Sequence, residues 1–202
     1  MVRILVLVRF ILGLFAIAFF PAIAMSEEDG LYDAPPPDDA AYIRFIGFND
    51  TSEVSAFGFV FDDDRLTSGH YNILHADTVE GLDAGDIFTV VPGLQGAPVF
   101  NQEPERSRRK ILLRLVNLGY ADDVALKTAD GAVEIIGPTG SDSLGVREVN
   151  PVRIELNVFV ADDAIAAPIV LTLRPGEHLT IVVESDGGVT LLEDQAIPVP
   201  MK

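Results

Sequence analysis

Ser143 is the residue whose surroundings most suggest a nucleophile, because it lies in the segment Ser141-Asp142-Ser143-Leu144. A serine hydroxyl attacks an acyl group when an imidazole base lies within hydrogen-bonding reach and a third group orients that base. None of the three histidines has an aspartate three positions before it, and Ser143 falls in a loop between expected strands. We therefore predict that the chain has no catalytic residues.

The residues that could bind a metal ion are also poorly spaced. His70 and His75 are five positions apart, so a strand would place them on opposite faces, and zinc needs further ligands. The run Asp62-Asp63-Asp64 lacks the spaced oxygen ligands of a calcium loop and fits a solvated turn better. The chain has no cysteine, which excludes thiol catalysis and thiolate metal sites. We predict no metal site and no cofactor.

Basic residues gather at one place in this acidic chain. Four of the 14 lysines and arginines fall within residues 106–110, and two further arginines occupy matching positions of two expected strands. The cluster could bind an anionic polymer or an acidic partner, or it could offset neighbouring acids and keep a linker soluble. The candidate residues for binding a partner or a polymer are Arg106, Arg108, Arg109, Lys110, Arg44 and Arg114.

Residues 1–24 predict a cleaved signal peptide. Arg3 and Arg9 precede an apolar stretch, and the Ala-Ile-Ala that ends at residue 24 fits a small-x-small cleavage rule. An uncleaved membrane anchor is the alternative. Removing this segment changes the formal charge from −17 to −19, so we expect no binding to nucleic acid and no stable membrane insertion. Without cysteines, the exported chain must be stabilised by its core alone.

The rest of the chain is expected to be all-β. Residues 25–41 are acidic and rich in proline, and they should form an extended N-terminal segment. Short apolar runs separated by turn residues then predict an N-terminal β-sandwich at 42–101, a basic linker at 102–110 and a C-terminal β-sandwich at 111–199. We expect two small antiparallel sandwiches in tandem, similar to immunoglobulin-like or carbohydrate-binding domains.

Two stretches of the predicted C-terminal sandwich have the clearest sequence patterns, one for a strand and one for a hairpin. Residues 152–160 alternate between apolar and mostly polar side chains, which is typical of a strand with one buried face. Asp130-Gly131 separates two apolar runs, and this dipeptide strongly favours a hairpin turn.

The two halves also resemble each other. Residues 42–48 match residues 112–118 at an offset of 70, which aligns Arg44 with Arg114, and residues 86–91 match residues 178–183. Either the chain contains a duplicated β-domain, or these strands are alike because all β-strands share a pattern.

Four blocks of sequence resemble the AlgF family of alginate biosynthesis proteins. They are residues 109–118, 126–131, 133–135 and 147–152. The blocks Leu-Lys-Thr-Ala-Asp-Gly and Arg-Glu-Val-Asn-Pro-Val are the most specific, and Leu31-Tyr32 followed by prolines is similar to the start of the mature family proteins. The likeness is loose across residues 49–104, where this chain is more acidic than we expect of the family.

The resemblance implies a non-catalytic periplasmic adaptor with two β-sandwich domains. It implies that the partners are the periplasmic alginate O-acetyltransferases and a membrane acyltransferase complex, with weak contact to the alginate polymer, an exopolysaccharide of biofilms. It supplies no catalytic residue. A carbohydrate-binding module that presents alginate to the acetyltransferase is the alternative, and an acetyl-ester hydrolase or transferase that uses Ser143 is the least favoured one.

Overall fold

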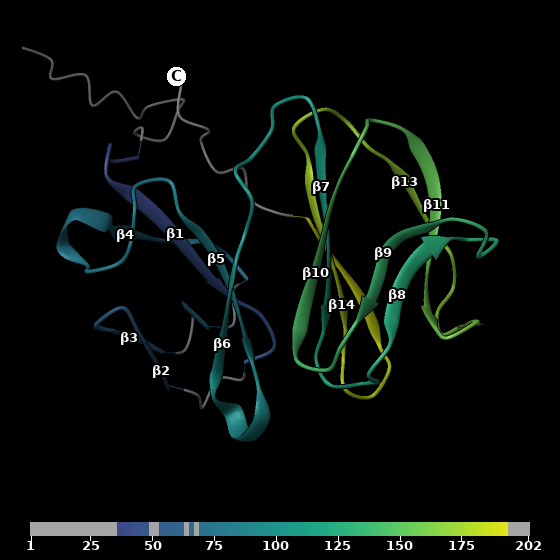
Figure 1. The fold of residues 1–202 in the computed structure, drawn as a ribbon, viewed down its shortest axis with the longest axis horizontal. Helices are drawn as coiled ribbons and strands as arrows, with labels where there is room; N and C mark the ends of the chain where they lie inside the picture. The colour runs from purple at the N-terminus through teal and green to yellow at the C-terminus, as the bar shows by residue number, and fades with distance from the viewer. Residues whose placement is uncertain (1–35, 49–52, 63–64, 67–68, 194–202) are drawn as a thin grey trace, which may run out of the picture. The chain divides into compact units, whose positions relative to one another are not determined.

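The computed structural model describes residues 36–48, 53–62, 65–66 and 69–193, which belong to one compact unit, Pro35–Lys202 (Figure 1). The predicted signal peptide and most of the predicted extended segment lie outside the described residues. No helix among the described residues is long and apolar enough to cross a bilayer.

Fifteen strands and two short 3-10 helices are assigned in this part of the chain. The first half contains β1 (Ala40–Phe45), β2 (Glu53–Ala56), β3 (Phe59–Asp62), β4 (Asn72–His75), η1 (Ala76–Thr78), β5 (Ile87–Pro92), η2 (Leu94–Gly96) and β6 (Pro98–Gln102). The second half contains β7 (Ile111–Asn117), β8 (Val124–Thr128), β9 (Glu134–Thr139), β10 (Ser143–Val149), β11 (Arg153–Val160), β12 (Asp163–Ala164), β13 (Ile169–Thr172), β14 (His178–Val183) and β15 (Val189–Glu193). The predicted all-β class is confirmed.

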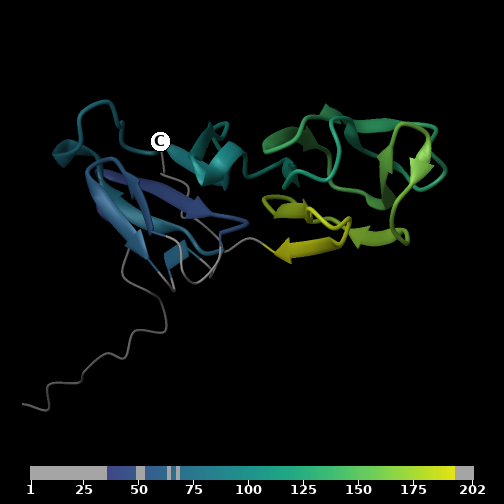
Figure 2. The same ribbon diagram turned by 90° about the horizontal axis from the view of Figure 1, so that it is seen from below.

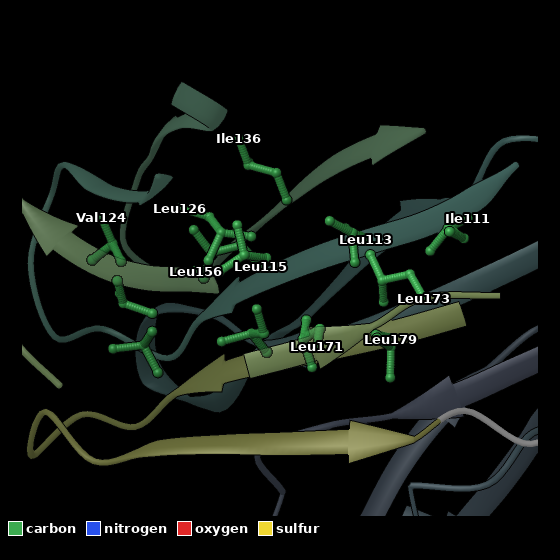
Figure 3. Close-up of a cluster of buried hydrophobic side chains, with 13 residues drawn as sticks. Ile111, Leu113, Leu115, Val124, Leu126, Ile136, Leu156, Leu171, Leu173 and Leu179 are labelled. Carbon is green, nitrogen blue, oxygen red and sulfur yellow. The ribbon is translucent and has the colours of Figure 1, made fainter. Parts of the chain in front are cut away.

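The second half is a sandwich of two sheets (Figures 1 and 2). One sheet has the order β10-β7-β14-β15, and the other has the order β12-β11-β8-β9, with β13 paired to β11. Alternate residues of these strands point inward and form one apolar cluster, whose labelled side chains lie between the sheets in Figure 3. Burial of this cluster is the main stabilisation of the half, because no disulfide exists.

The predicted hairpin and the long predicted strand are both present. β8 and β9 pair in antiparallel fashion, and Gly131 in the turn between them has φ +73°, a conformation that glycine adopts without strain. Asp130 supports this turn, because its Oδ1 accepts hydrogen bonds from Thr128 Oγ1 at 2.5 Å and from the Ala132 amide at 3.1 Å. The strand predicted at residues 152–160 is β11.

The first half packs a four-stranded sheet on a hairpin. The sheet has the order β4-β1-β5-β6, and the hairpin is β2–β3. Ile43 and Phe45 of β1 point toward Val54 of β2 and Phe61 of β3 in a shared apolar cluster. Aromatic contact reinforces it, since the Phe45 and Phe61 ring centroids are 4.8 Å apart.

The sheets are not wholly antiparallel as predicted. β1 pairs with β5 in parallel, and β7 pairs with β14 in parallel. A parallel pair needs a long crossover connection, and in both cases several strands intervene in the chain. Sequence periodicity marks strands but does not reveal which strands meet, so this feature was missed.

Of the two explanations for the likeness of the halves, the parallel pairs favour duplication. The orders β4-β1-β5-β6 and β10-β7-β14-β15 are equivalent, with the same directions of pairing at each step. Arg44 lies beside Thr89 in the first sheet, and Arg114 lies beside Thr180 in the second. An arginine–threonine pair at equivalent places in two equivalent sheets is more specific than a likeness shared by all strands.

Strands β1 and β7 are buried along their whole length, on both faces. Their inner faces join the two clusters already described. On the other side, Val116 of β7 and Ile46, which directly follows β1, belong to a further apolar cluster with Val91 and Val182. The two four-stranded sheets therefore contact each other through these faces. The division into separate domains at residues 42–101 and 111–199 stays a prediction.

Candidate functional site

Glu103 is a buried carboxylate in the segment that connects the two halves. It follows β6 directly, and its amide donates to the Ile87 carbonyl at 2.8 Å, so the backbone at this point is fixed against the edge of β5. The residue is 6% exposed and its side chain is fully enclosed. A carboxylate is rarely buried in a protein unless cations or hydrogen-bond donors surround it.

Residues of the first half contact one carboxylate oxygen of Glu103. Arg44 approaches Oε1 at 3.4 Å, the Tyr71 hydroxyl donates to it at 3.0 Å, and the Thr89 hydroxyl also donates to it. Arg44 Nε in turn donates to Thr89 Oγ1 at 2.8 Å. These contacts make the Arg44–Thr89 pair of the β1–β5 sheet one wall of the site.

Residues of the second half complete the site from the other side. Arg114 forms an ion pair with Oε2 of Glu103 and is 0% exposed. The guanidinium of Arg44 also reaches across, because its terminal nitrogen donates to Thr180 Oγ1 at 2.9 Å. Glu103 therefore joins the two equivalent arginines of the duplicated sheets through a single carboxylate.

Arg106 adds a third guanidinium to this cluster. It is 6% exposed, its terminal nitrogen lies 3.9 Å from Glu103 Oε2, and its guanidinium lies over the Tyr71 ring at 4.9 Å from the centroid. Arg44 contacts the same ring at 4.8 Å. Such cation–π contacts are stronger where the cation is removed from water, and both guanidinium groups are buried. We call Glu103 with Arg44, Arg106 and Arg114 the buried charge cluster.

The charges of the arginines decide the protonation state of Glu103. Burial alone would raise the pKa of this carboxyl, but the charges of Arg114 and Arg44 and the hydrogen bond from Thr89 outweigh burial and lower the pKa below its ordinary value of 4.5. The carboxyl is therefore ionised near neutral pH, which the cluster requires.

The six basic residues predicted to bind a partner or polymer thus fall into two groups. Arg44, Arg106 and Arg114 are buried in the charge cluster, so they present almost no surface to a second molecule. Each of them forms an ion pair with the Glu103 carboxylate. Arg108 and Arg109 are exposed, and Lys110 is half-buried, with its Nζ donating to Asn150 Oδ1 at 2.5 Å. Binding through these three residues stays a prediction.

A cavity of about 610 Å³ lies beside the exposed end of the linker. Leu171, Leu179 and Leu191 contribute apolar walls, and Arg174 and His178 line it as well. The linker runs along its edge: the Gly176 amide donates to the Lys110 carbonyl at 3.1 Å, and the Arg108 carbonyl oxygen lies 3.5 Å from where a Gly176 side chain would begin. Its volume lies in the range of small-molecule sites, but its lining is about as polar as it is apolar, whereas such sites are mostly apolar.

Ser143 begins β10, opposite Asn117 of β7. Its hydroxyl donates to the Gly140 carbonyl at 2.6 Å, and this contact closes the loop before the strand. The hydroxyl thus has a structural use in the fold.

Comparison with known proteins identifies the family. A sequence model described as "Alginate O-acetyl transferase AlgF" matches residues 12–180. The chain belongs to the AlgF family. The alginate biosynthesis protein AlgF of Pseudomonas aeruginosa is 28% identical over 182 residues, which cover 82% of each protein, and that of Azotobacter vinelandii is 31% identical over 156 residues, or 76% of this chain and 70% of the relative.

A solved structure of the C-terminal domain of AlgF from P. aeruginosa also matches, at 33% identity and a TM-score of 0.37, over 42% of this chain and 94% of that domain. The resemblance read from the sequence blocks is confirmed. The family name connects the chain with alginate biosynthesis and O-acetylation.

Sequence reasoning missed Glu103. It lies in an acidic Glu-Pro-Glu segment that looked like part of a solvated linker. The sequence did contain one indication of such a residue. Arg44 and Arg114 occur on otherwise apolar strands, so they are buried if both faces of those strands are covered. Buried arginines need a carboxylate partner, which predicts a buried acidic residue.

We predict that Glu103→Gln lowers the free energy of unfolding by about 3–5 kcal/mol, because the buried arginines lose their carboxylate while the side-chain shape is kept. Urea denaturation at pH 7 measures this loss. Glu148→Gln removes an exposed carboxylate and is the matched control, with an expected change within about 0.5 kcal/mol. Equal stability of the two variants would contradict a structural role for the cluster.

We also predict that the stabilisation by Glu103 depends on pH. Its pKa is lowered in the folded protein, so the contribution is complete above about pH 4.5 and is lost as the pH falls through the lowered folded-state pKa. The difference in unfolding free energy between the native chain and Glu103→Gln should therefore shrink below pH 4.5. A difference that stays constant between pH 7 and pH 3 would refute the ionised state.

Proposed function

We propose that this chain is a non-catalytic periplasmic adaptor in alginate O-acetylation, which bridges the periplasmic O-acetyltransferases and the membrane acyltransferase complex. Membership of the AlgF family supplies the biological process. The buried charge cluster is the observation that carries the adaptor role, because it fixes two β-rich halves to each other rather than forming an open reactive centre.

A fixed junction suits a bridging protein. Partners that bind the two halves are held at a defined separation, and preorganisation of this kind reduces the entropy that binding costs. The exposed strand edges offer a means of binding, since a partner strand can add to an unpaired edge through backbone hydrogen bonds. β4 and β6 are the outer strands of one four-stranded sheet, and β10 and β15 those of the other.

The position of Ser143 supports the non-catalytic assignment. A nucleophilic serine needs its hydroxyl proton directed toward a base, whereas the Ser143 hydroxyl, at the start of β10, donates to the main-chain carbonyl of Gly140 in the preceding loop. A signal peptide at residues 1–24 would deliver the chain to the periplasm, where the proposed partners act.

The adaptor proposal predicts two results in a strain whose own copy of this gene is deleted. A tagged wild-type chain should restore alginate acetylation and retain the periplasmic acetyltransferases in a pull-down. Ser143→Ala should do both equally well, as should the control Ser141→Ala. If Ser143→Ala stays folded and keeps its partners but abolishes acetylation, the chain is an enzyme and the proposal is wrong.

Direct binding of alginate is a second candidate function, favoured by one observation. The main chain of Arg108 lies beside Gly176 at the edge of the cavity that Arg174 and His178 line, and the side chains of Arg108 and Arg109 are exposed in the same segment. Guanidinium groups pair with the carboxylates of uronate residues. The strongly negative charge of the whole chain opposes the approach of such a polymer at long range.

Calorimetric titration with a mannuronate oligosaccharide at low salt tests this second function. Binding should weaken as salt is added, because exposed charges are screened, and it should be lost in Arg108→Ala/Arg109→Ala. Arg147→Ala/Arg153→Ala removes two other exposed arginines and is the control. Equal affinity for both double variants would exclude the linker as the binding site.

A further inference from the structure

Asp39, His75 and Asp77 form a cluster of potential metal ligands in the first half, apart from the buried charge cluster. One ligand atom from each residue lies within 4.8 Å of the other two. Asp39 directly precedes β1, His75 ends β4 and Asp77 lies in η1. The sequence hid this grouping because Asp39 and His75 are 36 positions apart and meet only through the β1–β4 pairing.

Backbone contacts hold all three residues in place. Ala40 pairs with His75 in the sheet, and the Ala76 amide donates to the Asp39 carbonyl at 2.9 Å. The Thr78 hydroxyl donates to the His75 carbonyl at 2.7 Å and fixes the turn that carries Asp77. The ligand set is therefore preorganised by the sheet and by η1, which lowers the entropic cost of binding an ion.

The two carboxylates are close enough to disturb each other. Each offers an oxygen within 4.8 Å of the other and of a ring nitrogen of His75, and all three groups are at least partly exposed. A dication bound between them would offset the repulsion of the two negative charges.

The distances and donor types favour zinc. His75 Nδ1 lies 3.1 Å from each carboxylate oxygen of Asp39. Zinc–nitrogen and zinc–oxygen bonds of about 2.0–2.2 Å in a tetrahedral arrangement place two ligand atoms roughly 3.3–3.6 Å apart, so the His75–Asp39 pair needs only a small adjustment. A carboxylate oxygen of Asp77 lies within 4.8 Å of both. Calcium and magnesium prefer oxygen ligands alone, whereas an imidazole beside carboxylates suits zinc.

We propose that Asp39, His75 and Asp77 bind one zinc ion, with water completing the coordination. The ion would connect the start of β1 to the end of the outer strand β4. It would therefore stabilise this edge of the sheet, by an amount that rises with zinc concentration. The site includes neither Ser143 nor the linker and needs none of the proposed partners. A test of zinc binding is therefore independent of a test of the adaptor function.

Titration of the purified chain, residues 25–202 without a histidine tag, with zinc chloride tests the proposal. We expect one zinc per chain, and a rise in melting temperature that EDTA reverses. Affinity should fall at least about tenfold in His75→Gln and in Asp77→Asn, which keep side-chain size. His70→Gln changes a histidine outside the cluster and should bind zinc as the native chain does.

Three results would overturn the proposal. One is the absence of saturable zinc binding by a chain that circular dichroism shows to be folded. Another is equal affinity in the native chain, His75→Gln and Asp77→Asn, since zinc would then bind elsewhere. The third is calcium binding at least as tight as zinc binding, because the histidine would then have no part in the choice of metal.

Discussion

The ion pairs of one buried carboxylate are the constraint on which the arrangement of the described chain depends. Glu103 accepts contacts from Arg44 of the first sheet and Arg114 of the second, and neither guanidinium has access to bulk water. Separation of the halves would break the ion pair of Arg114 with Glu103 and the hydrogen bond from Arg44 to Thr180, and it would expose the apolar faces around them to water. The apolar contacts between the sheets add to the same junction but could tolerate sliding, whereas hydrogen-bonded ion pairs require one register.

The equivalence of the two four-stranded sheets explains why the junction has this form. Equivalent sheets present equivalent arginine–threonine pairs, and the two sheets meet through the faces that carry those pairs. The connecting segment then supplies the one group that both arginines need. A second sheet also covers the outer faces of β1 and β7, which is why these strands are mostly apolar on both sides, apart from the arginines and Asn117 at the end of β7.

Features that depend on neighbouring residues in the sequence were predicted well. Features that depend on which distant strands pair were not. The alternation at residues 152–160 and the Asp130-Gly131 turn depend on neighbours in sequence, and both were correct. The pairing of β1 with β5, the contact of Glu103 with Arg44 across 59 positions and the meeting of Asp39 with His75 depend on which strands lie side by side. Periodicity carries no such information, so half of the basic residues chosen as surface ligands turned out to be buried.

The burial of β1 and β7 on both faces bears on how the chain responds to proteolysis. A cut within residues 104–110 that let the halves drift apart would uncover Ile46 and Val91 on one fragment and Val116 and Val182 on the other. Each fragment would then expose an apolar surface interrupted by an arginine, and these two surfaces contact each other in the intact chain. The two fragments of a nicked chain are therefore expected to stay associated and to migrate as a single species under native conditions. Either fragment produced alone is expected to aggregate.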